Sequence, residues 1–360
     1  MESLGRPRTD ADPARDVLGR VRGPRYPAPV LVLRADPWTP DHGMGFEAVL
    51  DEPPARAEPF VETRDWERPI APHPAPPAPV WFVDGVRRIE QRLIAQQDGR
   101  RGHALFGSYA VGTVRSDGRA AFRSHVVRRA LVLGSSLERG PVRVAAGGVE
   151  LVYEPVSEPG SEPDDPLHRL QKEMQRTESE VAIDAASAGD ELVLADGRWT
   201  SQRPTNSPVV GVVKRWSRAY LVPEQEALVA RLGPGERTPL FGLAKPEEPV
   251  GRFAWYARLC ALRPEWHDHA GVVRCEVRAG IGLDDAAAVA DRVTALLPAF
   301  AGRPSDPRYP QNLAPIAALE SWLQHRMGHR GVVRRALVEW LTTQAAGDRS
   351  APAPRRVRAG

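Results

Sequence analysis

Lysine and cysteine are scarce in this chain of 360 residues. Lys172, Lys214 and Lys245 are the only lysines among 49 basic residues, and all the others are arginine. Arginine forms paired hydrogen bonds with phosphate groups, although a biased genome composition gives the same usage. The two cysteines, Cys260 and Cys275, have neither the spacing of a zinc site nor the number needed for a disulfide framework. We therefore expect them to be partly buried thiols.

Long apolar runs are also missing. No stretch approaches the roughly 18 apolar residues that a membrane-spanning helix needs. The opening residues, MESLGRPRTDADPARD, are polar and carry acids, which does not fit a secretory signal. With 42% hydrophobic and 26% charged residues, the composition is typical of a globular cytoplasmic protein. The net charge of +3 only weakly favours a polyanionic partner.

Three common functional motifs are absent. The chain has no Walker A sequence, no Rossmann glycine pattern and no Gly-x-Ser-x-Gly. The first two absences argue against a P-loop nucleotide site and a dinucleotide site. The third argues against the nucleophile elbow of a serine hydrolase.

The composition divides the chain into three parts. Residues 1–79 are rich in proline and arginine, and we expect at most short strands there, one of them within 27–38. The segment PIAPHPAPPAP (69–79) predicts a stiff, extended connector. Residues 80–345 carry apolar patterns throughout and predict the folded domain. Residues 346–360 predict a disordered tail.

Strand patterns and helical patterns follow one another in the folded domain. This order predicts an α/β fold with a mixed sheet flanked by helices and with additional helices at the C-terminal end. We expect strands at 80–83, 103–114, 122–134, 142–155, 191–197, 208–216, 219–222, 253–262 and 271–280. We expect helices at 86–97, 167–187, 283–300, 312–328 and 332–344.

Two aspartates occupy matching places in this pattern. Asp84 ends the apolar run VWFV, Asp196 ends the apolar run ELVLA, and each is followed by glycine. An ionised carboxylate at the end of a buried strand is costly unless it is paired or binds a cation. Two such carboxylates on adjacent strands would hold a hard divalent metal. The alternative is that both Asp-Gly pairs are ordinary turns.

A glutamate and a lysine lie near this predicted site. On the helix 167–187, Glu178 follows Met174 by four residues and so shares its inward-facing stripe. Three converging acids would suit a two-metal hydrolysis of a phosphodiester. Lys214, at the end of the apolar run VVGVVK, would then meet the scissile phosphate. Alternatively, Glu178 reaches solvent from the edge of the stripe, and Lys214 simply ends a strand in solvent.

The order of these features is similar to that of the NurA nuclease family. The resembling pieces are FVDG (82–85), LQKEMQRTESE (170–180), LVLADG (192–197), VVGVVK (209–214) and DPRYPQNL (306–313). The resemblance implies a ribonuclease-H-like fold, manganese-dependent cleavage of DNA, a ring-like homodimer and partnership with a HerA-type hexameric translocase ATPase.

The resemblance also implies roles for individual residues. By position, Asp84, Glu178 and Asp196 would be the metal ligands, and Tyr309 would line the site. The family pattern continues to a catalytic histidine, but the corresponding place here, around Ala317, has none.

The predicted function is a DNA nuclease that uses Mn²⁺ or Mg²⁺, with two ions expected. It would process DNA ends beside a HerA-type ATPase. The alternative, favoured by the missing histidine, is a DNA-binding clamp or adaptor for such an ATPase that does not cleave.

Overall fold

The computed structural model describes most of the chain beyond residue 30. The described ranges are 31–35, 54–74, 78–215, 218–304 and 308–350. Its strands are β1 (Val32–Ala35), β2 (Arg56–Glu58), β3 (Val80–Gln97), β4 (Arg100–Ser116), β5 (Ala120–Leu133), β6 (Val142–Ala146), β7 (Val149–Ser157), β8 (Leu192–Asp196), β9 (Val209–Val213), β10 (Phe241–Ala244), β11 (Val250–Arg258) and β12 (Val272–Arg278). Its α-helices are α1 (Asp165–Ser187), α2 (Pro223–Arg231), α3 (Leu283–Leu296), α4 (Ala314–Arg326) and α5 (Arg330–Ser350).

The described strands join into one mixed sheet. Their order is β2-β10-β11-β12-β9-β8-β3-β4-β5-β7-β6, and β1 pairs with the far end of β3. In the middle, β3, β4 and β5 form an antiparallel meander, and β8 and β9 run parallel to β3. On the other side, β9 pairs antiparallel with β12. The prediction of a mixed sheet flanked by helices is confirmed.

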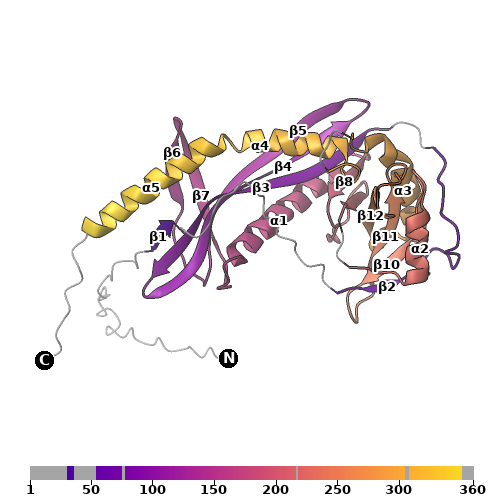
Figure 1. Ribbon diagram of the computed structural model, residues 1–360, viewed down its shortest axis with the longest axis horizontal. Coiled ribbons are helices and arrows are strands. Elements are labelled where there is room, and N and C mark those ends of the chain that lie inside the picture. Colours follow the sequence, from indigo (N-terminus) through magenta and orange to yellow (C-terminus); the bar gives the residue numbers. More distant parts are fainter. Residues whose placement is uncertain (1–30, 36–53, 75–77, 216–217, 305–307, 351–360) are drawn as a thin grey trace, which may run out of the picture. The chain divides into compact units, whose positions relative to one another are not determined.

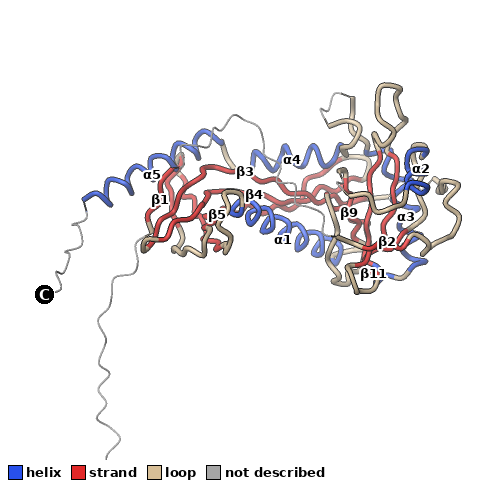
Figure 2. The backbone as a smooth tube through the Cα atoms, turned by 60° about the horizontal axis from the view of Figure 1, so that its bottom comes forward, coloured by secondary structure: helices blue, strands red, loops and turns tan. Residues whose placement is uncertain are grey.

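Helices cover both faces of the central strands. On one face, Val83 packs in a buried cluster with Met174 of α1. On the other face, Phe82 and Leu194 pack in a separate cluster with Leu319 of α4. Figure 2 shows α1 and α4 on opposite sides of β3 and β4. Neighbouring residues in a strand point to opposite faces of the sheet. The contacts of Phe82 and Val83 therefore show which residues near them point toward α4 and which point toward α1.

The helix predicted for residues 86–97 is wrong. These residues continue β3, which is a long strand beside β4 in Figure 1. A bulge between Ile89 and Gln91 shifts the alternation of the strand by one position. The shift brings the apolar residues to a helix-like spacing. The strand ends in a tight hairpin at Asp98-Gly99, where φ is +50° and +77°.

The strand predicted for residues 219–222 is also wrong. This segment is a loop in which Leu221 packs against Leu228 of α2. The Tyr220 ring lies 5.0 Å from the guanidinium carbon of Arg274. Leu221 alone of the four residues is buried, and Val222 is exposed, because the segment is a loop that covers α2 through one side chain. A short apolar run does not distinguish such a loop from a strand. The sequence patterns also missed α2, β2 and β10.

The remaining predicted elements are present with modest changes at their ends. The segment 142–155 forms a hairpin of β6 and β7 in place of one strand. The short strand expected within 27–38 is β1, and α5 extends to Ser350. The rest of the expected tail, 351–360, lies outside the described residues, as do 1–30 and 36–53. No helix among the described residues is long and apolar enough to cross a bilayer.

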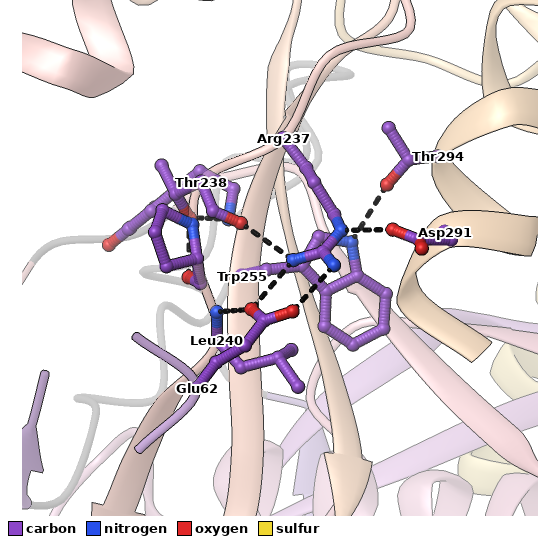
Figure 3. Close-up of polar contacts among 9 residues, drawn as sticks. Glu62, Arg237, Thr238, Leu240, Trp255, Asp291 and Thr294 are labelled. Carbon is purple, nitrogen blue, oxygen red and sulfur yellow. Dashed lines mark hydrogen bonds and ion pairs between the residues drawn. The ribbon is translucent and has the colours of Figure 1, made fainter. Parts of the chain in front are cut away.

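A buried ion cluster ties the segment before β3 to the sheet. Arg237 is 1% exposed, and it donates to Glu62 through two N–H groups at 2.8 and 2.9 Å and to Asp291 of α3 at 2.7 Å (Figure 3). Glu62 also accepts from the backbone N–H of Leu240 at 2.6 Å. All three guanidinium nitrogens of Arg237 donate hydrogen bonds, and both carboxylate oxygens of Glu62 accept them. Buried charges avoid a large desolvation penalty only when they are paired in this way.

Candidate metal centre

Asp84 and Asp196 lie at the same level on two parallel strands. The register pairs Phe82 with Leu194 and Val83 with Ala195, so each aspartate is the next residue beyond the last pair. Since Phe82 and Leu194 face α4, the alternation directs both carboxylates to that face. The prediction that Asp84 and Asp196 occupy matching positions on adjacent strands is therefore confirmed.

A third acid completes this group from the α4 layer. One carboxylate oxygen from each of Asp84, Asp196 and Glu320 lies within 4.8 Å of the others. Carboxylate oxygens at this separation suit a hard divalent cation such as Mg²⁺, Mn²⁺ or Ca²⁺. Glu320 belongs to α4, one turn after Ala317, in the helix where a histidine was expected and not found.

Asp84 is a buried carboxylate with one oxygen left unsatisfied by the described residues. It is 5% exposed, and its Oδ1 accepts from the Gly85 N–H at 2.7 Å. Its Oδ2 is buried and has no hydrogen-bond partner among the described residues. Burial and the neighbouring Asp196 raise the pKa of Asp84 well above its usual value, and Lys214 opposes this shift. A divalent cation would satisfy the unpaired oxygen and remove the repulsion.

Glu178, predicted as the third ligand, lies on the opposite face of the sheet and is not one of the three acids whose oxygens lie within 4.8 Å of one another. It projects from α1 over Gly85, and a side chain at Gly85 would collide with Glu178 Oε1. The lack of a side chain at Gly85 therefore allows this close approach. Burial, followed by the charge of Asp196, raises the pKa of Glu178 to about 8, against an ordinary value of 4.5. Glu178 faces inward, as predicted, and lies within electrostatic reach of both aspartates.

Lys214 is part of the group and does not end in solvent. Its Nζ donates to Asp196 Oδ2 at 2.9 Å and to Asn312 Oδ1 at 2.8 Å. Asn312 is buried beside it in the segment before α4. Gln311 donates to the Lys214 carbonyl at 3.3 Å and so fixes the same segment to the end of β9. The ammonium thus balances part of the negative charge of Asp84 and Asp196.

Arg308 covers the outer side of Glu320. Its NH1 donates to Glu320 Oε1 at 2.6 Å, and its NH2 contacts Oε2. The paired contact holds Glu320 toward the two aspartates and places a second cationic side chain at the rim.

Tyr309 contacts the β11–β12 loop. Its ring lies 5.3 Å from the Trp266 ring, and the Arg263 guanidinium carbon lies 5.5 Å from its centroid. It follows Arg308 directly, so its backbone is beside the rim of the carboxylate group. Its role in lining the site remains a prediction from the family resemblance.

Three residues of this group were missed from the sequence: Glu320, Asn312 and Arg308. Glu320 is more than 120 positions from both aspartates in the chain, so no local pattern connects them. The only available signal was its position on the helix where the family places a histidine.

Comparison with known proteins does not assign this chain to a family. No family model matches it, and no curated protein matches it. The functional argument therefore depends on the geometry of Asp84, Asp196, Glu320 and Glu178 and on the motifs themselves.

Proposed function

We propose that this protein is a divalent-cation-dependent DNA nuclease of the NurA type. The observation that carries the proposal is the group of Asp84, Asp196 and Glu320, in which the buried Asp84 Oδ2 has no hydrogen-bond partner in the part of the chain that the structure describes. Purely structural carboxylates of this kind are normally neutralised by arginine or by several N–H donors. Here Lys214 and Arg308 are two cationic side chains against three carboxylates, and neither donates to Asp84, which leaves negative charge for a cation.

The order of the central strands supports a ribonuclease-H-like domain. An antiparallel meander of β3, β4 and β5 is followed by the hairpin β6–β7, by α1 and then by β8, which returns parallel to β3 on its free side. This connection places the ends of β3 and β8 together and creates the position shared by Asp84 and Asp196. Such ends are a frequent place for active sites in α/β sheets.

The donor set supports Mn²⁺ or Mg²⁺, and two ions are proposed. Asp84, Asp196 and Glu320 would hold the cation, with Glu178 beside them. Bound there, a divalent cation supplies Lewis-acid stabilisation of a phosphodiester and lowers the pKa of water. Asp84 and Glu178 must lose their protons before they can act as ligands, because metal binding requires the ionised carboxylate. Lys214 and Arg308 would hold the phosphate against this centre.

The cellular setting is proposed from the resemblance alone. It comprises a cytoplasmic homodimer that processes DNA ends beside a HerA-type hexameric ATPase. The alternative function, a clamp or adaptor that binds DNA without cleavage, is favoured by the lack of a histidine near Ala317. Glu320 weighs against that alternative because it brings an anionic oxygen ligand to the same helix.

Cleavage of end-labelled linear DNA in Mn²⁺ separates the two functions. We expect the wild type to cleave with Mn²⁺ and not with EDTA, and Asp84→Asn to bind DNA but not cleave it. Asp98→Asn is the matched control because it changes the same functional group in an exposed turn, at φ +50° where asparagine is well tolerated. If the wild type binds DNA but does not cleave it under any divalent cation, the adaptor function replaces the nuclease.

A further inference from the structure

A partly exposed aromatic and cationic cluster, centred on the half-buried Trp322, lies on the other side of α4 from the carboxylates. The ring of Phe122 in β5 stacks on Trp322 of α4, with centroids 4.9 Å apart and planes within 3°. His125 meets the same indole edge-on at 4.9 Å, and the Arg326 guanidinium carbon lies 4.7 Å from its centroid. Phe122 is 37% exposed, and His125 and Arg326 are exposed.

The strand register connects this cluster to the candidate metal centre. Asp84 pairs with Gly112 across β3 and β4, and Gly112 pairs with His125 across β4 and β5. Two strand spacings, or about 10 Å, therefore separate Asp84 from His125 in one row across the sheet. Leu323 of α4 rests on Gly112 between them. The two sites thus flank one helix.

The two segments that carry the cluster are rich in arginine. From Gly118 to Leu137 the sequence has four arginines and no acid, and from Ser321 to Val338 it again has four arginines and no acid. Asp117, which precedes the first segment, is paired with Arg115 at 2.5 Å. A surface that presents aromatic rings among arginines is complementary to a nucleic acid strand with unpaired bases, since bases stack on the rings and phosphates bind the guanidinium groups.

We propose that Phe122, His125, Trp322 and Arg326 bind a single-stranded segment of nucleic acid next to the metal centre. The inference rests on the proposed nuclease function, to which it adds a preference for an unpaired end as substrate. The solvent side of α4 supports a path between the two sites, because Ala318, Ser321 and His325 lie there with no acid among them.

A purely structural explanation of the cluster makes different predictions. Arginines on an exposed edge strand prevent edge-to-edge association, and an aromatic stack could serve only to attach the β4–β5 hairpin to α4. In that case Trp322 would matter for stability and not for binding.

Binding of a fluorescent 20-nucleotide oligo-dT in EDTA, measured by anisotropy, tests the proposal. We expect Trp322→Ala to weaken binding by about tenfold and Trp322→Phe to restore most of the loss. Phe60→Ala, at another exposed aromatic residue that is 58% exposed, should have no effect. Arg326→Glu and Arg123→Glu provide surface variants whose folding should be unaffected. They should weaken binding at low salt and lose their effect as salt rises.

Several results would overturn the proposal. One is a wild type that does not bind oligo-dT, and another is a full set of variants that bind it like the wild type. A third is a duplex of the same length that binds more tightly and loses as much affinity on Trp322→Ala. Because these measurements use metal-free protein, they are independent of cleavage: a failed nuclease assay with intact Trp322-dependent binding would reject the proposed function alone.

Discussion

The carboxylates of Asp84 and Asp196 extend from matching positions of two adjacent parallel strands and point to the same face of the sheet. Burial and the charge of Asp196 raise the pKa of Asp84, and the ammonium of Lys214 opposes this shift. A buried carboxylate beside a second one is costly, and an oxygen-only donor set of this kind suits the hard divalent cation proposed above.

The first prediction concerns the affinity for Mn²⁺. Glu320→Gln should weaken Mn²⁺ binding at least tenfold. Loss of a residue that only hydrogen-bonds to a metal ligand already lowers metal affinity by about 10- to 100-fold, and loss of a ligand should cost no less. Isothermal titration calorimetry at pH 8 would measure it, with Asp98→Asn as the unchanged control. Wild-type affinity in Glu320→Gln would mean that the cation is held by Asp84, Asp196 and Glu178 without α4.

The second prediction concerns stability against pH without metal. The pKa of Glu178 is about 8 in the folded protein and near 4.5 when unperturbed. Between these values the folded state keeps a proton that the unfolded state has released, so stability falls as pH rises through this window. Asp84, whose pKa is also raised, acts in the same direction.

Thermal unfolding in EDTA from pH 5 to pH 9 would show this effect. Glu178→Gln should reduce the fall in melting temperature, whereas Glu180→Gln, at an exposed position two residues away, should not. Added Mn²⁺ should stabilise the wild type more at pH 8 than at pH 6, because metal binding displaces the protons. Equal slopes for the wild type and Glu178→Gln would contradict the burial of this carboxyl group.

The third prediction concerns Gly85. A methyl group there would meet Glu178 Oε1 and would lie 3.0 Å from Met174 Cγ. We expect Gly85→Ala to lower the free energy of unfolding by about 1–3 kcal/mol, as overpacking usually does. Gly140→Ala is the control, since nothing lies within 4 Å of the added carbon. In urea unfolding, Gly85→Ala with Glu178→Ala should cost less than the sum of the single changes.

The matching positions of Asp84 and Asp196 were predicted correctly, whereas part of the path of the chain around them was not. Asp84 and Asp196 were identifiable because each ends a short apolar run, and runs of that kind are typical of parallel strands buried on both faces. The second half of β3 was misread because the bulge before Gln91 gives Val86, Ile89 and Leu93 a helix-like spacing. A one-residue bulge leaves no separate mark in the composition of the strand.

The residues that complete the site are set by tertiary contacts. Glu320 on α4 meets the aspartates only because Leu323 packs on Gly112 and brings the helix onto β4. That contact depends on long-range pairing, which single-sequence patterns do not encode. The buried pair Arg274–Glu276 illustrates the same limit, since charged residues that alternate with apolar ones are typical of a solvent-exposed strand face, and the structure buries both residues completely.

The fourth prediction concerns the ion cluster of Figure 3. Arg237→Met should destabilise the protein by about 3–5 kcal/mol. The reason is that Glu62 and Asp291 both lose their ion pair with the guanidinium group. In the wild type, Arg237 lowers the pKa of Glu62 and offsets the cost of burying this carboxylate. The substitution removes that offset. Urea unfolding would measure the loss, and Arg56→Met, at an exposed ion pair, should change stability by less than about 1 kcal/mol.

The fifth prediction separates two effects of Lys214. Its ammonium lies 2.9 Å from a proposed ligand oxygen of Asp196, so it competes with a cation for that carboxylate. Lys214→Met should therefore strengthen Mn²⁺ binding while it slows DNA cleavage, because the phosphate loses a positive partner. Lys245→Met is the control, since its ion pair with Glu248 is exposed. A parallel loss of Mn²⁺ affinity and cleavage would show instead that Lys214 chiefly holds Asp196 and Asn312 in place.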